Sequence, residues 1–245
     1  MEYSTLFPFF LLTLFLAAHA VAVLYLWSRD YYSHLKLLLV SIWMLALFFS
    51  GNLITLSPGI EVNSGMFFLI GYYLIGYVLC KELGVTDYLE TLKRQFIVIA
   101  SLLLITLPLV LLQLYGYVTR SVFDLKNLID DVFIERMDYI GIIIFSFYFG
   151  QLLYANSFRY LARRSFGFEF LIRIPVIMQV QSFIFYFLSL FILAKNLTLT
   201  QAIYGVANII VDGGIIRYLS LLILFIPFYA MYHYKQRSGK LIHAE

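Results

Sequence analysis

The sequence predicts an all-α membrane protein, a polytopic bundle of about seven transmembrane helices that forms a single domain over residues 1–245. Of these residues, 62% are hydrophobic and 13% are charged, whereas charged residues make up about a quarter of an average soluble domain. Apolar runs of about 20 residues, the length that crosses the hydrocarbon core, recur between charged breaks. No alternation with a period of two is sustained, so helices rather than strands are predicted.

The first predicted span needs separate treatment because it resembles a signal peptide. Its Ala18-His19-Ala20 segment is similar to a cleavage site, but Glu2 precedes it without any Lys or Arg, and apolar residues continue to Trp27. We therefore expect a retained helix. The chain divides into an N-terminal helix at about 5–28, a core at about 36–233 and a short cytoplasmic tail at 234–245. The predicted spans lie near residues 5–28, 36–57, 65–82, 95–118, 138–161, 170–194 and 204–233.

The positions of Lys and Arg predict the orientation of these spans. Cytoplasmic connections carry an excess of both residues, and here one set of connections holds most of them. The C-terminus then lies in the cytoplasm and the N-terminus outside, which requires an odd number of spans and agrees with seven. The predicted location is the plasma (inner) membrane. The basic set comprises Arg29, Lys36, Lys81, Lys93, Arg94, Arg159, Arg163, Arg164, Arg173, Lys235, Arg237 and Lys240.

Polar side chains inside the spans are the most informative residues. Such groups are costly at membrane depth, and they usually face a cavity or a partner helix. Each taken alone is compatible with a bond between packed helices, but their recurrence on four spans favours a shared polar ligand. Arg217 needs a carboxylate, backbone carbonyls or an electron-rich ligand, and the alternatives are a pair with Asp212 or a position at the interface. The set comprises Asn52, Gln151, Gln179, Gln181, Ser182, Asp212 and Arg217.

The sequence shows no catalytic constellation, so an enzyme is not predicted. HExxH, GxSxG, GxGxxG and P-loop motifs are missing, and the four histidines are scattered. The single Cys80 excludes an intrachain disulfide and a Cys-rich metal site. The acidic connection at 119–138 lacks the ligand spacing of a calcium loop. No catalytic residue, metal, cofactor or nucleic-acid partner is therefore expected.

Several landmarks follow one another in a fixed order and spacing. They are Asn52 at the end of an early span, Gly65 and Gly84 around the next span with Lys81 before the second glycine, Gly150-Gln151-Leu152-Leu153 with Phe158, the basic Arg159, Arg163 and Arg164, the Gln179–Phe187 segment, and Arg217 before Pro227. This order resembles the queuosine-precursor transporter family, also described as vitamin uptake transporters, from about Leu38 to Arg237. Distant relatives are the substrate-binding subunits of energy-coupling-factor transporters.

The resemblance implies a six-helix core, with the N-terminal helix as an addition, and uptake of a small purine-like solute. The solute would be a queuosine precursor (preQ0, preQ1 or queuine) or a related nucleobase or vitamin. This chain has Tyr77, Tyr154 and Ser182 where the family has acidic residues, so its substrate can differ. The expected substrate-binding residues are Asn52, Tyr77, Gln151, Tyr154, Gln179, Ser182, Tyr186 and Arg217.

Two other functions remain open at this point. One is a substrate-capture subunit that works with an ATPase module, for which Ala18 and Ala22 on the first span offer a packing face. The other is a membrane scaffold or sensor that transports nothing. The partners expected for the leading function are the solute, a flat polar heterocycle, and the lipid bilayer, while a homo-oligomer stays open.

Overall fold

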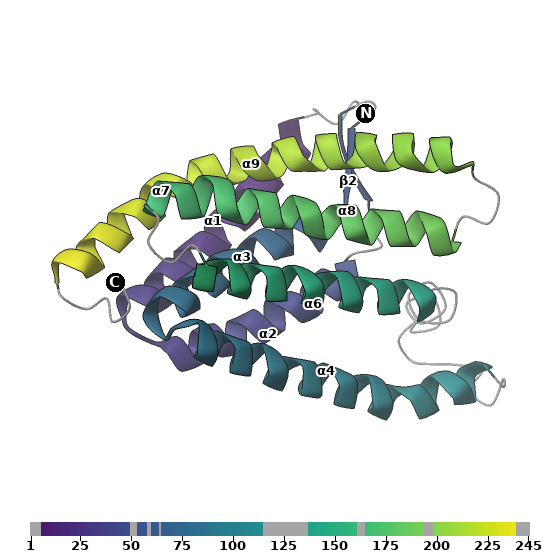
Figure 1. The fold of residues 1–245 in the computed structure, drawn as a ribbon, viewed down its shortest axis with the longest axis horizontal. Helices are drawn as coiled ribbons and strands as arrows, with labels where there is room; N and C mark the ends of the chain where they lie inside the picture. The colour runs from purple at the N-terminus through teal and green to yellow at the C-terminus, as the bar shows by residue number, and fades with distance from the viewer. Residues whose placement is uncertain are drawn as a thin grey trace.

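The structure, a computed structural model, describes residues 6–49, 53–57, 60–63, 65–114, 137–160, 165–193 and 198–238. Long helices lie side by side, with α4 along one edge of the bundle and α9 along the other (Figure 1). The elements are α1 Leu6–Ser28, α2 Tyr32–Phe49, β1 Leu53–Ser57, β2 Ile60–Asn63, α3 Gly65–Glu82, α4 Val85–Leu114, α6 Met137–Tyr160, α7 Phe166–Phe168, the π-helix η2 Glu169–Arg173, α8 Ile174–Leu193 and α9 Leu199–Arg237. The predicted helical bundle is confirmed, and a short hairpin joins it.

The predicted span at 36–57 is wrong at its C-terminal end. Helix α2 stops at Phe49, and Leu53–Ser57 instead forms β1, which pairs antiparallel with β2 at Ile60–Asn63. The reason is local composition, because β-branched residues favour strands and the intervening Pro58-Gly59 is a turn-forming pair. Hydropathy alone does not separate such a hairpin from the end of a helix.

Other boundaries also differ from the sequence prediction, among them the start of α2 at Tyr32 and the start of α9 at Leu199. Helix α4 begins at Val85, ten residues before the predicted span at 95–118. Helix α9 continues to Arg237, so the predicted tail at 234–245 begins as helix, and Lys235 within it is fully buried. Both extensions are helical turns that contain charged residues and continue an apolar helix. A search for apolar runs does not include such charged turns.

Helix α3 is the centre of the bundle. It packs against α1, α2, α4 and α9, and every residue from Ile70 to Glu82 is buried. A helix that is hydrophobic all round is expected in such a position. It ends at Glu82, and Gly84 follows with a φ of 85°, in the left-handed region that glycine adopts without strain. The polar side chains of α3 therefore face other helices.

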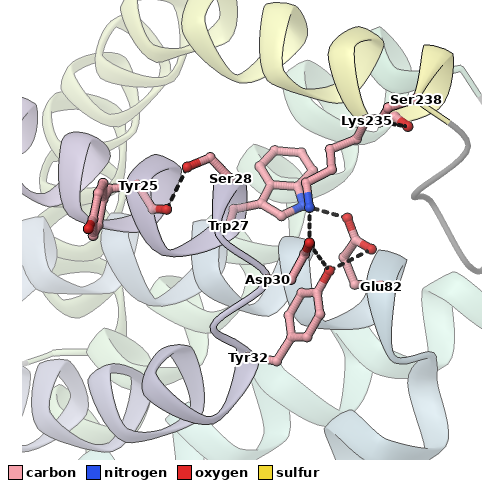
Figure 2. A network of polar contacts seen from close by, with 8 residues as sticks. All are labelled: Tyr25, Trp27, Ser28, Asp30, Tyr32, Glu82, Lys235 and Ser238. Atoms are coloured by element: carbon pink, nitrogen blue, oxygen red, sulfur yellow. Dashed lines mark hydrogen bonds and ion pairs between the residues drawn. The ribbon is translucent and has the colours of Figure 1, made fainter.

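A network of polar contacts ties α1 and α9 to the end of α3 (Figure 2). Trp27 Nε1 donates to Glu82 Oε1 at 2.5 Å, and the Tyr32 hydroxyl donates to Glu82 Oε2 at 3.0 Å. The Tyr32 hydroxyl also lies 2.9 Å from Asp30 Oδ1, which forms an ion pair with the buried Lys235. The N-terminal helix is therefore fixed to the core by side chains of α3 and α9.

Apolar surface is exposed on the outer helices. Large apolar side chains are exposed there. The exposed fraction is 68% for Leu104 on α4 and 73% for Ile226 on α9. Of the described residues, one helix, Phe166–Leu188, is long and apolar enough to cross a membrane, and Thr13–Ser28 and Tyr32–Ala46 are shorter apolar helices. Membrane crossing by the rest of the bundle stays a prediction.

Candidate functional site

A band of buried polar side chains runs through the interior between α3, α6, η2, α8 and α9. At one end lies the cation of Arg217, and at the other end lies an ion-pair cluster around Glu169. Tyrosines connect the two ends. The band comprises Tyr73, Tyr77, Lys81, Gln151, Tyr154, Glu169, Arg173, Gln181, Ser182 and Arg217, all of which are buried.

Arg217 and Ser182 are brought into direct contact, although 35 positions separate them. The guanidinium Nη1 donates to Ser182 Oγ and, at 3.3 Å, to the backbone carbonyl of Met178. Ser182 Oγ donates to the same carbonyl at 2.9 Å. The guanidinium also interacts electrostatically with Tyr73 and with the half-buried Tyr186. A backbone carbonyl is one of the partners that the sequence predicted for this cation, while the side chain of Asp212 lies outside the described part of the chain.

Tyr73 links the Arg217 end to the middle of the band. Its hydroxyl donates to Gln181 Oε1 at 2.5 Å, and its ring meets the ring of Tyr154 edge-on with centroids 5.3 Å apart. Gln181 lies so close to α6 that a Cβ on Gly150 would fall 2.6 Å from its Oε1 atom. Glycine is therefore required at position 150 for α6 and α8 to approach this closely.

Gln151 and Tyr154 leave polar groups without a partner. Gln151 is fully buried on α6, and its Oε1 atom accepts from the Tyr88 hydroxyl at 2.6 Å. Within the described residues, no hydrogen-bond partner lies in reach of Gln151 Nε2 or of the Tyr154 hydroxyl. A buried polar group without a partner costs about 1–3 kcal/mol, so each such group calls for an explanation.

The far end of the band is a cluster of charges. Lys81 Nζ lies 2.9 and 2.8 Å from the two carboxylate oxygens of Glu169, and Arg173 Nη1 lies 3.8 Å from the first of them. The Arg173 guanidinium sits 4.4 Å from the ring centre of Phe158, and Lys81 Nζ 5.7 Å from it. The Tyr77 hydroxyl is buried near this cluster and has no hydrogen-bond partner among the described residues. Pairing of the ions offsets part of the cost of burying their charges.

Sequence reasoning missed part of this band. The distribution of basic residues assigns Lys81 and Arg173 to cytoplasmic connections, and the search for polar residues within the spans does not select Tyr73 or Glu169. The i,i+4 spacing of Glu169 and Arg173 was a readable sign of a pair on one helix face. No comparable sign marks Tyr73, because only the packing of α3 against α8 brings it to Gln181.

Three predicted site residues are not part of the described band. Gln179 is half-buried and lines a surface groove with Pro175, Gly214 and Tyr218. A Cβ on Gly214 would fall 2.7 Å from Gln179 Nε2, so this side chain lies between α8 and α9. Asn52 lies outside the described residues. Tyr186 is half-buried and interacts electrostatically with Arg217 at one end of the band. The structure thus brings together Tyr77, Gln151, Tyr154, Ser182 and Arg217 within the band.

Comparison of the chain with known protein families, with curated protein sequences and with solved structures finds no match. The similarity to queuosine-precursor transporters therefore rests on the sequence landmarks alone.

Proposed function

We propose that the chain is a multi-pass membrane transporter that takes up a small purine-like solute, a queuosine precursor or a related nucleobase. The observation that supports this function is the buried polar band, in which the Tyr154 hydroxyl and Gln151 Nε2 lack partners among the described residues. The proposed orientation places the C-terminus in the cytoplasm and the N-terminus outside, in the plasma (inner) membrane.

A bilayer accounts for the distribution of polarity. The outward side chains of α4 and α9 include exposed Leu104, Ile105, Ile223 and Ile226, while charged residues lie buried inside. In water this arrangement would expose apolar surface and bury charge, and both are unfavourable. In lipid the apolar exterior costs nothing, and intramembrane charges are expected to face the interior and to pair there. The bundle is therefore proposed to be embedded in the membrane along its length.

A flat heterocycle suits the unpartnered groups of the band. Its ring nitrogens and carbonyl oxygens would accept hydrogen bonds from Gln151 Nε2 and from the Tyr154 hydroxyl. Its faces would pack on the aromatic side chains that surround these two groups. The ring centroids of Tyr154 and Phe158 lie 5.1 Å apart, and those of Tyr77 and Phe158 lie 6.3 Å apart. An aromatic pair in a favourable geometry contributes about 1 kcal/mol beyond the area that it buries.

The band is closed to the surroundings, because Gln151 and Tyr154 are fully buried. Solute entry therefore requires that neighbouring helices part, first on one side of the membrane and then on the other. Rocking of helix bundles around a site near the middle of the membrane is the common mechanism of secondary transporters. The close contact of α6 and α8 at Gly150 marks a boundary across which such a movement would take place.

Uptake into proteoliposomes tests this function. The purified chain would be reconstituted and supplied with labelled preQ0, preQ1, queuine and adenine. We expect saturable uptake of at least one of them, and its loss in Gln151→Leu, which removes the amide from the band. Leu152→Ala is the matched control, because Leu152 is the next residue of α6 and is 46% exposed.

Three results would count against the proposal. If none of the four bases is taken up, the solute is not one of these purine-like compounds. If Gln151→Leu and the parent chain show equal uptake, the assignment of the site is wrong. Accumulation that appears only after an ATPase module has been added would instead identify a substrate-capture subunit.

A further inference from the structure

A groove on the surface of the molecule, separate from the buried band, lies between α2 and α4. Its volume is about 300 Å³, at the lower end of the range of small-molecule sites. Lys36, Leu37 and Val40 form the α2 wall, and residues between Asp87 and Val98 form the α4 wall. No residue of the buried band lines this groove, so it is not part of the proposed transport site.

The charged residues that line the groove carry both signs, and their formal charges sum to zero. Lys36 Nζ lies 2.5 Å from Asp87 Oδ2, and Arg94 Nη2 lies 2.5 Å from Glu90 Oε1. All four side chains are partly or largely exposed. Exposed ion pairs contribute little to stability, so each charge can exchange its partner for a charged group of a ligand. A ligand with one positive and one negative charge therefore suits the groove better than a plain anion or cation.

A buried hydrogen-bond donor belongs to the same wall. Gln95 lines the groove, is only 1% exposed, and accepts at its Oε1 atom from the Tyr72 hydroxyl at 2.7 Å. The group of Gln95 that remains is its donor Nε2, which has no hydrogen-bond partner in the part of the chain that the structure describes. A buried donor without a partner is unfavourable. An oxygen atom of a ligand in the groove would satisfy it.

The order of these groups along α4 matches the order of the parts of a phospholipid. The carboxylates of Asp87 and Glu90 come first, the guanidinium of Arg94 and the amide of Gln95 follow about one turn later, and the apolar Val98 lies about one turn beyond them. A phospholipid with an ammonium headgroup presents an ammonium, a phosphate, ester carbonyls and acyl chains in that sequence. The exposed side chains beyond Val98 include Leu102, Leu104 and Ile105.

We propose that this groove binds a phospholipid whose headgroup carries a phosphate and a primary ammonium, that is, phosphatidylethanolamine. The ammonium would lie against the two carboxylates, the phosphate would lie against Lys36 and Arg94, and an ester carbonyl would accept a hydrogen bond from Gln95 Nε2. Hydrogen bonds between such charged groups are shorter and stronger than those between neutral groups. This inference rests on the membrane embedding in the proposed function and is independent of the solute that is transported.

Three lipids with the same acyl chains and different headgroups test the inference. Phosphatidylcholine keeps both charges, but its ammonium has no N–H group to donate, and phosphatidylglycerol has no positive charge. Binding of each lipid to the full-length chain in detergent would be measured by native mass spectrometry. We expect phosphatidylethanolamine to bind about fivefold more tightly than either, the usual value of one hydrogen bond. The soluble headgroup glycerophosphoethanolamine should not displace it at equal concentration.

Variants of α4 assign the contacts. Asp87→Asn should reduce the preference for phosphatidylethanolamine over phosphatidylcholine to less than about twofold, because it removes a charged acceptor of the ammonium. Arg94→Gln and Gln95→Leu should weaken the binding of all three lipids, which share the phosphate and the ester carbonyls. Lys93→Gln is the matched control, because it removes an exposed positive charge of α4 that does not line the groove. Asp87→Asn and Arg94→Gln decide the question even if Gln95→Leu does not fold.

The outcomes separate this inference from the transport function. Equal binding of phosphatidylethanolamine and phosphatidylcholine overturns the headgroup assignment and leaves the transporter standing. Displacement by glycerophosphoethanolamine identifies a soluble zwitterion as the ligand and overturns the lipid site. Equal effects of Arg94→Gln and Lys93→Gln overturn the placement in the groove. A chain that stays in solution without detergent and binds none of the three lipids overturns the membrane embedding itself, whereas failure of the uptake panel with the lipid preference intact overturns only the transporter.

Discussion

Gly150 sets how closely α6 can approach α8. Its missing side chain leaves room for Gln181, whose Oε1, Cβ and Cδ atoms would lie 2.6, 2.9 and 3.0 Å from an added Cβ. That side chain in turn accepts the hydrogen bond of Tyr73 at 2.5 Å. One glycine thus allows a polar bridge between α3 and α8 to exist in the interior.

Gly150→Ala should therefore destabilise the protein by about 1–3 kcal/mol, the usual cost of overpacking a well-packed interior. Gly141→Ala is the matched control on the same helix, because a Cβ there meets nothing within 4 Å. Alanine also has the higher helix propensity, by roughly 1 kcal/mol, so this control should unfold at the same or a higher temperature. Thermal unfolding of the purified protein measures both variants, and equal unfolding temperatures would contradict the close contact.

At the scale of the element, polar contacts at the C-terminal end of the N-terminal helix α1 add to the apolar packing along its length. Buried Glu82 accepts from Trp27 of α1 and from Tyr32 of α2, so one carboxylate at the end of α3 fixes two neighbouring helices (Figure 2). Asp30 adopts a φ of 60°, a conformation that Asp tolerates better than most residues, and this places it beside Lys235 of α9.

Glu82→Leu should loosen α1. The change removes the acceptor of two donors and leaves Trp27 Nε1 unpaired, which costs about 1–3 kcal/mol for each buried group. Glu90→Leu is the control, because its pair with Arg94 is exposed and surface pairs contribute at most about 1 kcal/mol. Hydrogen exchange of residues 13–28 reports the effect. Unchanged protection of α1 in Glu82→Leu would show that the network does not hold it.

Sequence reasoning predicted the elements where apolar runs end at charges or glycines. The expected span at 65–82 coincides with α3, and the expected 5–28 and 138–161 lie within one residue of α1 and α6 at both ends. It failed where chemistry other than hydropathy decides, at the hairpin of β1 and β2 and in the charged turns at the start of α4 and the end of α9. The hairpin follows from β-propensity. The two charged turns form ion pairs with distant residues, Asp87 with Lys36 and Lys235 with Asp30.

The site was predictable only in part, for a related reason. Arg217, Gln151 and Ser182 stand out because polar side chains at these positions are costly. Their partners do not stand out, since Tyr73 is one aromatic residue among many and the contact of Lys81 with Glu169 spans 88 positions. Three-dimensional packing alone identifies which costly residues already have a partner.

At the scale of the whole molecule, polarity is arranged from the inside outwards. Exposed apolar side chains cover α4 and α9, and cations, amides and hydroxyls meet around α3. A bundle that served only as a scaffold would be expected to pair every interior group, because each orphaned group weakens it. The Tyr154 hydroxyl and Gln151 Nε2, unpartnered within the described residues, therefore favour an interior that accepts a ligand.

Tyr154→Phe tests this central claim most directly, because it removes the unpartnered hydroxyl and leaves the ring in place. The account predicts an unchanged or slightly raised unfolding temperature, since no described hydrogen bond is lost, together with solute binding or uptake weakened about five- to tenfold, the usual value of one hydrogen bond. Tyr88→Phe, which breaks the bond to Gln151, should instead lower the unfolding temperature. Parent-like binding and uptake by a stably folded Tyr154→Phe chain would contradict the account.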